Sequence, residues 1–416
     1  MPTANRQTAK STRAKSYLAD KINALPRPHD NDNPLWAGPS GIGPLGGVTQ
    51  SMLGRFLDCR ECFRLKYVLG LESHPKWNHR TGYGDMWHIC EEAEARSLLH
   101  DDWIHDLDDH VQEQLTKYPL QHDEITKWYN VCQVQFPEYV KYWADHPDVV
   151  NRTPLMQEQV FDVPYNLPSG RVARLRGKFD SVDLIEEGCA ACSGVGDEYG
   201  RCGACNNTRR TKGIYLQENK TKGDVDKLEI ERQLRFDLQT MMYLVALHEM
   251  ESYEDSPIPK GSPGRLAPIL GVRYNVARRP LSGGVGNIRP HAEKRTKNTY
   301  TPAETSEEFY ERLRRDYIAD DPGHWFFRVR SEVSERDIRV FRDTCLDPLL
   351  ETVCVWYEMT AGDRGFCGYA PELPPMNYRT PYGIYKSDGA NEYAYYLENG
   401  SEAGLRRVES LFPELQ

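Results

Sequence analysis

The chain has 416 residues, of which 62 are acidic and 52 basic, so its formal net charge is −10. This balance argues against a protein that coats nucleic acid along its whole surface, although it leaves room for a local basic cleft. The apolar share of 39% can fill a sizeable core and excludes wholesale disorder. The longest apolar stretch, residues 241–247, is far shorter than a membrane span of about 20 residues. The N-terminal residues 1–15 have no apolar signal region, so we expect a soluble intracellular protein without membrane contact.

The N-terminal part of the chain is predicted to lie outside the folded core. Residues 1–22 are polar and mildly basic, and residues 26–47 are dense in Pro, Gly and Asn. Such composition is typical of a frayed terminus followed by a linker, so we expect residues 1–47 to form a flexible arm. The folded domain then covers residues 48–416.

Apolar side chains in this domain first recur at the spacing of helices and then alternate like strands. We expect helices over residues 50–71 (with Gly70 as the C-cap), 85–98, 108–117 and 123–145. Strands follow over 157–164, 173–184 and 213–220, with a turn at Ser169 and Gly170. The last part is predicted to hold helices over 229–250, 306–318 and 334–359, strands over 267–277 and 324–330, and a loop-like tail. The predicted fold is α/β or α+β, a central mixed β-sheet flanked by helices with an inserted metal-binding knuckle.

Four of the eleven cysteines crowd into residues 189–205. They form two C-x-x-C pairs, Cys189 with Cys192 and Cys202 with Cys205. Two such pairs can supply the four thiolates of a closed tetrahedral Zn²⁺ site, so we predict a structural zinc knuckle inserted at residues 186–212. Disulfides are the alternative, which a reducing compartment disfavours.

Two basic segments could reach a phosphate backbone. Residues 208–212 follow the cysteines, and residues 283–297 form a glycine-rich basic loop. Each has an ordinary alternative, since solvated charges and mobile surface loops are common. The sequence leaves both interpretations open.

The strongest chemical signal joins two neighbouring predicted strands. The first strand carries the motif Gly-Lys-Phe-Asp, which ends at Asp180, and the second strand carries Glu218, Asn219 and Lys220. Residues i and i+2 of a strand point to the same side, so Glu218 and Lys220 project together, and Asp180 can lie opposite Glu218 if the strands pair. Two carboxylates and an ammonium group suit a Mg²⁺ or Mn²⁺ site for phosphodiester hydrolysis. For an isolated Glu-x-Lys motif, the alternative is a solvated salt bridge.

Two helical patterns add side chains of the same chemistry. His88 and Glu92 are one helical turn apart, and an imidazole there can be a metal ligand or an ordinary packed histidine. One face of the predicted helix 229–250 mixes guanidinium, amide and phenol groups, which suits a phosphate backbone or the edge of an amphipathic helix. The residues on that face are Arg232, Arg235, Gln239 and Tyr243.

The order of these motifs resembles the PD-(D/E)XK nuclease superfamily in its RecB-like exonuclease branch, which includes CRISPR-adaptation exonucleases and many phage proteins. The motifs are SMLGRFLDC at 51–59, GDMWH at 84–88, GKFD at 177–180, ENK at 218–220 and QTMMY at 239–243. The resemblance covers roughly residues 50–400 and implies a restriction-endonuclease-like core, so that residues 48–416 form one nuclease domain.

The resemblance also implies a role for each matching residue. The ligands of a catalytic Mg²⁺ or Mn²⁺ ion would be His88, Asp180, Glu218 and the main-chain carbonyl of Asn219. Lys220 would assist catalysis, while Gln239 and Tyr243 would support the site and the DNA.

Many relatives also hold an iron–sulfur cluster, on one cysteine near the first motif and three near the C-terminus. Cys59, with Cys62 close by, matches the first position. Residues 374–400, where the other three would be expected, contain no cysteine, and Cys345, Cys354 and Cys367 lie upstream at unlike spacings. We therefore expect no iron–sulfur cluster.

These observations lead to three hypotheses. The first is a metal-dependent DNA exonuclease for recombination, repair or processing, which acts on single-stranded DNA or duplex ends beside recombination or replication proteins. The second is a catalytically weak or inactive nuclease-fold protein that binds DNA as a recombination accessory. The third is a zinc-clip interaction module without DNA affinity. The resemblance places the protein in the cytoplasm, of a bacterial host cell if a phage encodes it.

Overall fold

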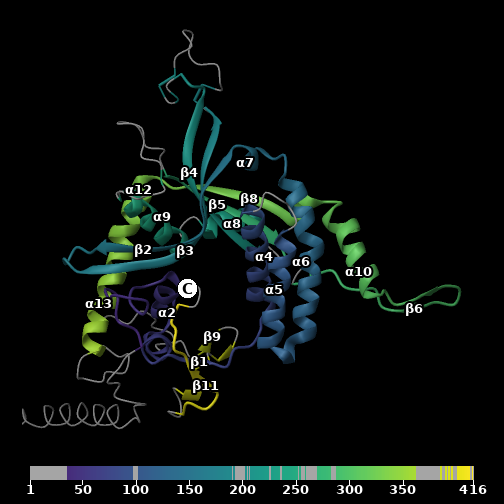
Figure 1. The fold of residues 1–416 in the computed structure, drawn as a ribbon, viewed down its shortest axis with the longest axis horizontal. Helices are drawn as coiled ribbons and strands as arrows, with labels where there is room; N and C mark the ends of the chain where they lie inside the picture. Colours follow the sequence, from purple (N-terminus) through teal and green to yellow (C-terminus); the bar gives the residue numbers. More distant parts are fainter. Residues whose placement is uncertain are drawn as a thin grey trace, which may run out of the picture.

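The fold is built on a central sheet between two groups of helices, seen in the computed structural model of Figure 1. The structure describes residues 35–361 except 97–101, 190, 193–201, 204, 206, 224–225, 235–236, 252, 254–257, 259–268 and 283–286, and then residues 385–386, 389–390, 392–393, 395–396, 401–412 and 415. Among these residues, no helix is long and apolar enough to cross a bilayer.

The central sheet has five strands in the order β2-β3-β4-β5-β8. Their bounds are β2 Arg152–Asn166, β3 Val172–Gly188, β4 Arg210–Lys222, β5 Ile269–Arg278 and β8 Phe326–Glu332. Strands β4 and β5 run parallel, and the other neighbours run antiparallel. The sheet is therefore mixed, as the alternation of apolar residues predicts, and the turn at Gly170 has the expected positive φ of 84°.

One face of the sheet packs against an apolar helical layer. This layer consists of α2 (Gln50–Asp58), α9 (Leu238–Glu251), α12 (Glu335–Phe341) and α13 (Asp347–Ala361). Its core is continuous from α9 to the strands, because residues 240–247 of α9 are all buried. Helix α12 begins at a capping box made by Ser334 and Asp337, near the start of the helix predicted over 334–359.

A second helical group with its own aromatic core lies toward the other face. Its helices are α4 (His79–Arg96), α5 (Asp102–Lys117), α6 (His122–Trp143), α10 (Ser306–Arg312) and α11 (Pro322–Trp325). Helix α10 lies beyond α6, away from the strands (Figure 1). This arrangement confirms a sheet flanked by helices on both faces.

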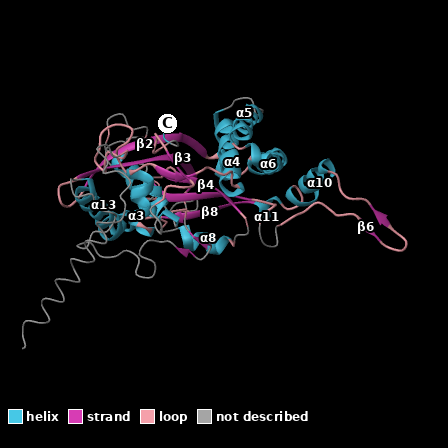
Figure 2. Cartoon of the chain, turned by 90° about the horizontal axis from the view of Figure 1, so that it is seen from below, coloured by secondary structure: helices cyan, strands magenta, loops and turns pink. Residues whose placement is uncertain are grey.

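Short elements complete the chain, and two hairpin ends project from the body. The short helices are α3 (Arg60–Phe63), α7 (Pro147–Val150) and α8 (Lys227–Leu234), and wider or tighter helical turns cover Arg64–Val68, Pro119–Gln121, Leu313–Ile318 and Arg342–Leu346. Short strands are β1 (Leu71–Ser73), β6 (Lys294–Arg295), β7 (Tyr300–Thr301), β9 (Tyr385–Lys386), β10 (Gly389–Ala390) and β11 (Leu405–Arg407). The ends of β3 and β4 project in Figure 1, and the β6 hairpin, within the predicted basic loop, extends beyond α10 in Figure 2.

Two predicted helices are interrupted in the structure. The helix over 50–71 ends at Asp58, because Cys59 has extended backbone angles, and Leu71 belongs to strand β1. The helix over 229–250 is two helices, α8 and α9. Asp237 causes the restart, since its carboxylate accepts hydrogen bonds from the backbone N–H groups of Gln239 and Thr240. Gly70 has a φ of 66°, as expected of a C-cap.

The flexible arm predicted for residues 1–47 needs correction in its last part. Residues 1–34 lie outside the described residues. From residue 36 onward the segment packs on the sheet: Trp36 is fully buried and its Nε1 donates to the Gly47 carbonyl at 2.8 Å. Arg176 on β3 donates to the Pro44 carbonyl at 2.7 Å. The tail is likewise not all loop, because β11 pairs with β1.

Candidate active site and metal centres

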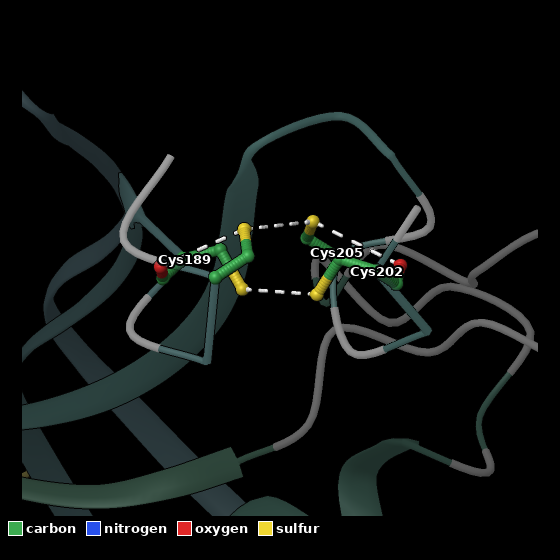
Figure 3. A group of neighbouring side chains, drawn as sticks. Cys189, Cys202 and Cys205 are labelled. Carbon is green, nitrogen blue, oxygen red and sulfur yellow. Dashed lines mark hydrogen bonds between the residues drawn. The ribbon is translucent and has the colours of Figure 1, made fainter. Parts of the chain in front are cut away.

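The four clustered cysteines lie together at the projecting end of the β3–β4 hairpin (Figure 3). The Sγ atoms of Cys189 and Cys202 are 3.8 Å apart, and so are those of Cys192 and Cys205. Zinc–sulfur bonds of about 2.3 Å in a tetrahedron place neighbouring sulfur atoms roughly 3.8 Å apart, so the spacing fits one ion bound by four thiolates. The cluster can therefore bind a metal such as zinc.

The turn that holds these cysteines is closed by hydrogen bonds. The Cys189 N–H donates to the Arg209 carbonyl at 2.8 Å, and the Cys202 N–H donates to Oδ1 of Asn207 at 2.6 Å. Both Asn207 and Arg209 have positive φ. Beyond them, the basic side chains of Arg210 and Lys212 contact Glu186 on β3 at 3.5 and 3.1 Å. Their charges are thus partly matched within the hairpin.

Glu218 and Lys220 project from β4 toward helix α9, as their spacing predicts. Glu218 is fully buried, and its Oε2 accepts hydrogen bonds from Nζ of Lys220 at 2.9 Å and from Nε2 of Gln239 at 3.0 Å. Nζ of Lys220 also lies 3.3 Å from Oε1 of Gln239. The other oxygen of Glu218, Oε1, has no hydrogen-bond partner among the described residues. A buried carboxylate oxygen without a partner is costly unless a ligand satisfies it.

Asp180 lies on β3, the strand paired with β4, and is a close electrostatic neighbour of Glu218. Its Oδ2 accepts a hydrogen bond from the backbone N–H of Asn219 at 2.7 Å and lies 3.9 Å from Nδ1 of His88 on α4. The structure thus brings the predicted residues His88, Asp180, Glu218 and Lys220 to one place. The side chain of Asn219 points away from Glu218, and its Oδ1 accepts hydrogen bonds from the buried side chains of Gln217 and Asn275.

Glu158 is a member of this site that the sequence did not reveal. Its Oε1 lies 3.5 Å from Nδ1 of His88, and its Oε2 lies 2.6 Å from Nζ of Lys178. The ligand atoms of His88, Glu158 and Asp180 all lie within 4.8 Å of one another, which is close enough to hold one ion. Glu158 reaches them from β2 with a φ of 44°, a conformation that a glutamate within a strand rarely adopts. No local pattern signals such a residue.

Burial and charge change the pKa values of these groups. Burial raises the pKa of Glu218 to about 7, and Asp180 adds to the rise while Lys220 opposes it. Burial alone would lower the pKa of His88, but the carboxylates of Asp180 and Glu158 raise it to about 9. Burial would also lower the pKa of Lys220, yet Glu218 and Asp180 hold it above its usual value. The carboxylates of this site therefore favour the charged forms of His88 and Lys220.

Tyr243 and Gly177 support the site through packing. The ring of Tyr243 meets Phe161 and Phe179 edge-to-face, with centroids 5.2 and 5.7 Å apart. A Cβ atom at Gly177 would lie 2.6 Å from the Phe161 ring and 3.0 Å from that of Tyr243. Only glycine therefore fits there. Of the predicted face of helix 229–250, Gln239 and Tyr243 lie on α9, Arg232 lies on α8, and Arg235 is outside the described residues.

Of the other cysteines, Cys90 and Cys132 are buried free thiols whose Sγ atoms lie 3.8 Å apart. Cys59 and Cys62 are joined by a disulfide under a small apolar cluster with Tyr393 and Tyr396. Cys345 is exposed and Cys354 is buried, both as free thiols. Cys367 lies outside the described residues.

No protein-family model and no curated protein matches this chain. The candidate site is therefore defined by its geometry. That geometry combines a four-thiolate cluster with a separate, half-buried group of carboxylates, one imidazole and one ammonium. The first set suits a soft metal ion such as zinc, and the second offers mainly oxygen ligands.

Proposed function

We propose that the chain is a divalent-metal-dependent DNA nuclease of the PD-(D/E)XK, RecB-like type, an exonuclease for DNA recombination, repair or processing. The observation that carries this proposal is the contact of Glu218 with both Lys220 and Gln239, next to the ligand group of His88 and Asp180. A solvated salt bridge does not account for it, because Glu218 is fully buried.

The residues present fit a Mg²⁺ or Mn²⁺ ion. Oε1 of Glu218 is without a hydrogen-bond partner among the described residues, and Asp180, Glu158 and His88 offer further oxygen and nitrogen ligands beside it. When bound, such an ion would polarise the scissile phosphate and lower the pKa of an attacking water.

Lys220 and Gln239 act on the substrate side of this arrangement. Glu218 and Gln239 hold the Lys220 ammonium in a fixed place, so it can orient water or stabilise charge on the phosphate without reorganising. Gln239 in turn holds Glu218 through its amide group. We assign Lys220 as the catalytic lysine and Gln239 and Tyr243 as positioning residues.

For the cysteine tip, we propose a structural zinc ion bound by Cys189, Cys192, Cys202 and Cys205. Four protein thiolates close the coordination sphere, so this ion takes no part in hydrolysis. It replaces the apolar core that a projecting hairpin end does not have.

The test is cleavage of end-labelled single-stranded and duplex DNA with Mg²⁺, Mn²⁺ or EDTA. The wild type should release label only with a divalent ion, and Lys220→Ala should lose that release. Lys141→Ala is the matched control, because Lys141 is an exposed lysine of α6 whose ammonium lies 3.8 Å from Glu138. Salt-dependent DNA binding without cleavage under any condition would contradict the nuclease and favour the DNA-binding accessory protein. If the protein neither binds nor cleaves DNA, the zinc-clip interaction module is the hypothesis that remains.

A further inference from the structure

The face of the sheet toward α4 and α6 is polar, unlike the apolar face under α9. Arg273 is fully buried there, with its Nη2 donating to Asp183 at 2.7 Å and its Nε donating to Gln217 at 3.0 Å. Asn275 donates through Nδ2 to Glu91 at 2.6 Å and to Asn219 at 3.1 Å. These buried polar side chains therefore form a hydrogen-bonded network on this face of the sheet.

A cavity of about 380 Å³ opens on this polar face between α4, α6 and strands β2, β4 and β8. It adjoins the candidate metal site from two directions. Glu91 in its wall follows His88 by one helical turn, and Asn219 in its floor donates its backbone N–H to Asp180 at 2.7 Å. Its size is in the range of small-molecule sites.

Buried polar atoms of the cavity-lining side chains that have no hydrogen-bond partner among the described residues include Oε2 of Glu91, Nε1 of Trp143 and Nη1 of Arg328. Oε1 of Glu91 accepts hydrogen bonds from Tyr139 and Asn275, and Nε of Arg328 donates to Asn275 at 3.2 Å, so the Glu91 and Arg328 side chains are held in place while one polar atom of each has no partner among the described residues. One acceptor and two donors around one cavity indicate a polar ligand.

The side chains that line the cavity suit a planar ring with hydrogen-bond donors and acceptors better than a phosphate group. The Arg328 guanidinium lies 4.0 Å from the centroid of Trp143, and guanidinium planes and aromatic rings are the surfaces on which nucleobases stack. Arg152, the other cation of the lining, is already engaged by Asp183 at 2.8 Å. Glu91 and Glu94 would repel a phosphate.

We propose that this cavity binds a nucleobase of the DNA strand next to the candidate metal site, with Arg328, Trp143 and Glu91 contacting its polar edge. The inference rests on the proposed nuclease function and adds to it a base-binding subsite. Holding a base there would fix the adjoining phosphate relative to the metal ligands His88 and Asp180.

The test is binding of deoxyguanosine monophosphate to the full chain in EDTA, measured by calorimetry, beside deoxyribose 5-phosphate. We expect the nucleotide to bind and the sugar phosphate, which lacks the base, not to bind. Arg328→Gln should weaken nucleotide binding roughly tenfold, since it removes a hydrogen bond to a charged group. Trp143→Phe, which keeps a ring and loses the N–H, should weaken it about threefold and serves if the first variant fails to fold.

Arg330→Gln is the matched control. Arg330 lies on the same strand two residues on, but contacts Glu187 at 2.5 Å outside the cavity, and its loss should leave binding unchanged. Equal binding of the sugar phosphate, absent nucleotide binding, or no change in both cavity variants would each overturn the proposal. Binding is measured in EDTA and is therefore independent of cleavage. If the protein binds the nucleotide but never cuts DNA, the proposed nuclease function is rejected and the base-binding cavity is kept. Cleavage without nucleotide binding would reject the subsite alone.

Discussion

The two candidate metal centres of this chain are built in opposite ways. The four cysteines come from one hairpin end between β3 and β4, within residues 189–205. The carboxylate site takes one residue each from α4, β2, β3 and α9 and two from β4, and its central residue Glu218 is fully buried. The first centre is local in sequence and lies outside the core, while the second is assembled by the core.

This difference separates the tasks that each centre can perform. A closed set of four thiolates at a projecting tip can order a loop, but offers no open position to a substrate. The second site holds a lysine against Glu218, whose other carboxylate oxygen has no hydrogen-bond partner among the described residues and is left for a ligand. Changes in one centre should therefore leave the other intact.

The largest expected effect comes from Asp180→Asn. This change keeps the shape and the acceptor for the Asn219 N–H but removes a charged metal ligand. Because even outer-shell partners of a metal commonly contribute 10–100-fold, metal-dependent cleavage should fall by at least about 100-fold while bound zinc stays constant. Asp162→Asn, at a surface carboxylate of β2 that pairs with Arg174 and Arg176, should cleave like the wild type. Normal cleavage by Asp180→Asn would reject the site.

Next is Asp183→Ala, which tests the buried scaffold. Asp183 is fully buried and pairs with Arg273 and Arg152, so its loss leaves a buried guanidinium without its carboxylate. The free energy of unfolding should fall by about 3–5 kcal/mol, measured by urea denaturation. Asp316→Ala, at an exposed pair with Arg315, should leave it unchanged. Equal unfolding curves for the two variants would show that this network does not hold the sheet.

A smaller effect is expected from Glu158→Gln. The amide keeps the size of the side chain but weakens its contacts with His88 and Lys178. The Mg²⁺ concentration for half-maximal cleavage should rise about tenfold, with the maximal rate largely retained. Glu186→Gln, at the exposed pair with Lys212, is the control. An unchanged Mg²⁺ requirement would show that Glu158 only fixes Lys178.

The smallest effect on cleavage is expected from Cys202→Ser. Bound zinc, measured by mass spectrometry, should fall from about one ion per chain to none, because three thiolates and a hydroxyl bind zinc poorly. Protease sensitivity should rise at the hairpin end only, and cleavage should stay at the wild-type rate. Cys345→Ser, at an exposed free thiol, should keep the zinc. Loss of cleavage together with zinc would contradict the separation of the two centres.

The same difference decides how much the sequence could predict. The cysteine pairs and the Glu218–Lys220 spacing are local patterns, and the structure places their residues together. Asp237 interrupts the predicted helix 229–250, and its side-chain cap is a signal that sequence could have used. Glu158 and Arg328 could not be predicted, because their neighbours come from distant elements and Glu158 has a positive φ inside a strand. Packing of residues 36–47 likewise depends on Arg176 of a distant strand.

The most direct test of the account is anomalous diffraction from crystals grown with Mn²⁺, recorded on both sides of the manganese and zinc edges. We predict manganese within about 2.2 Å of oxygen atoms of Asp180 and Glu218 and zinc among the four cysteines. Manganese absent from the carboxylates, in crystals that keep zinc on the cysteines, would contradict the assignment of the buried site as a catalytic metal centre.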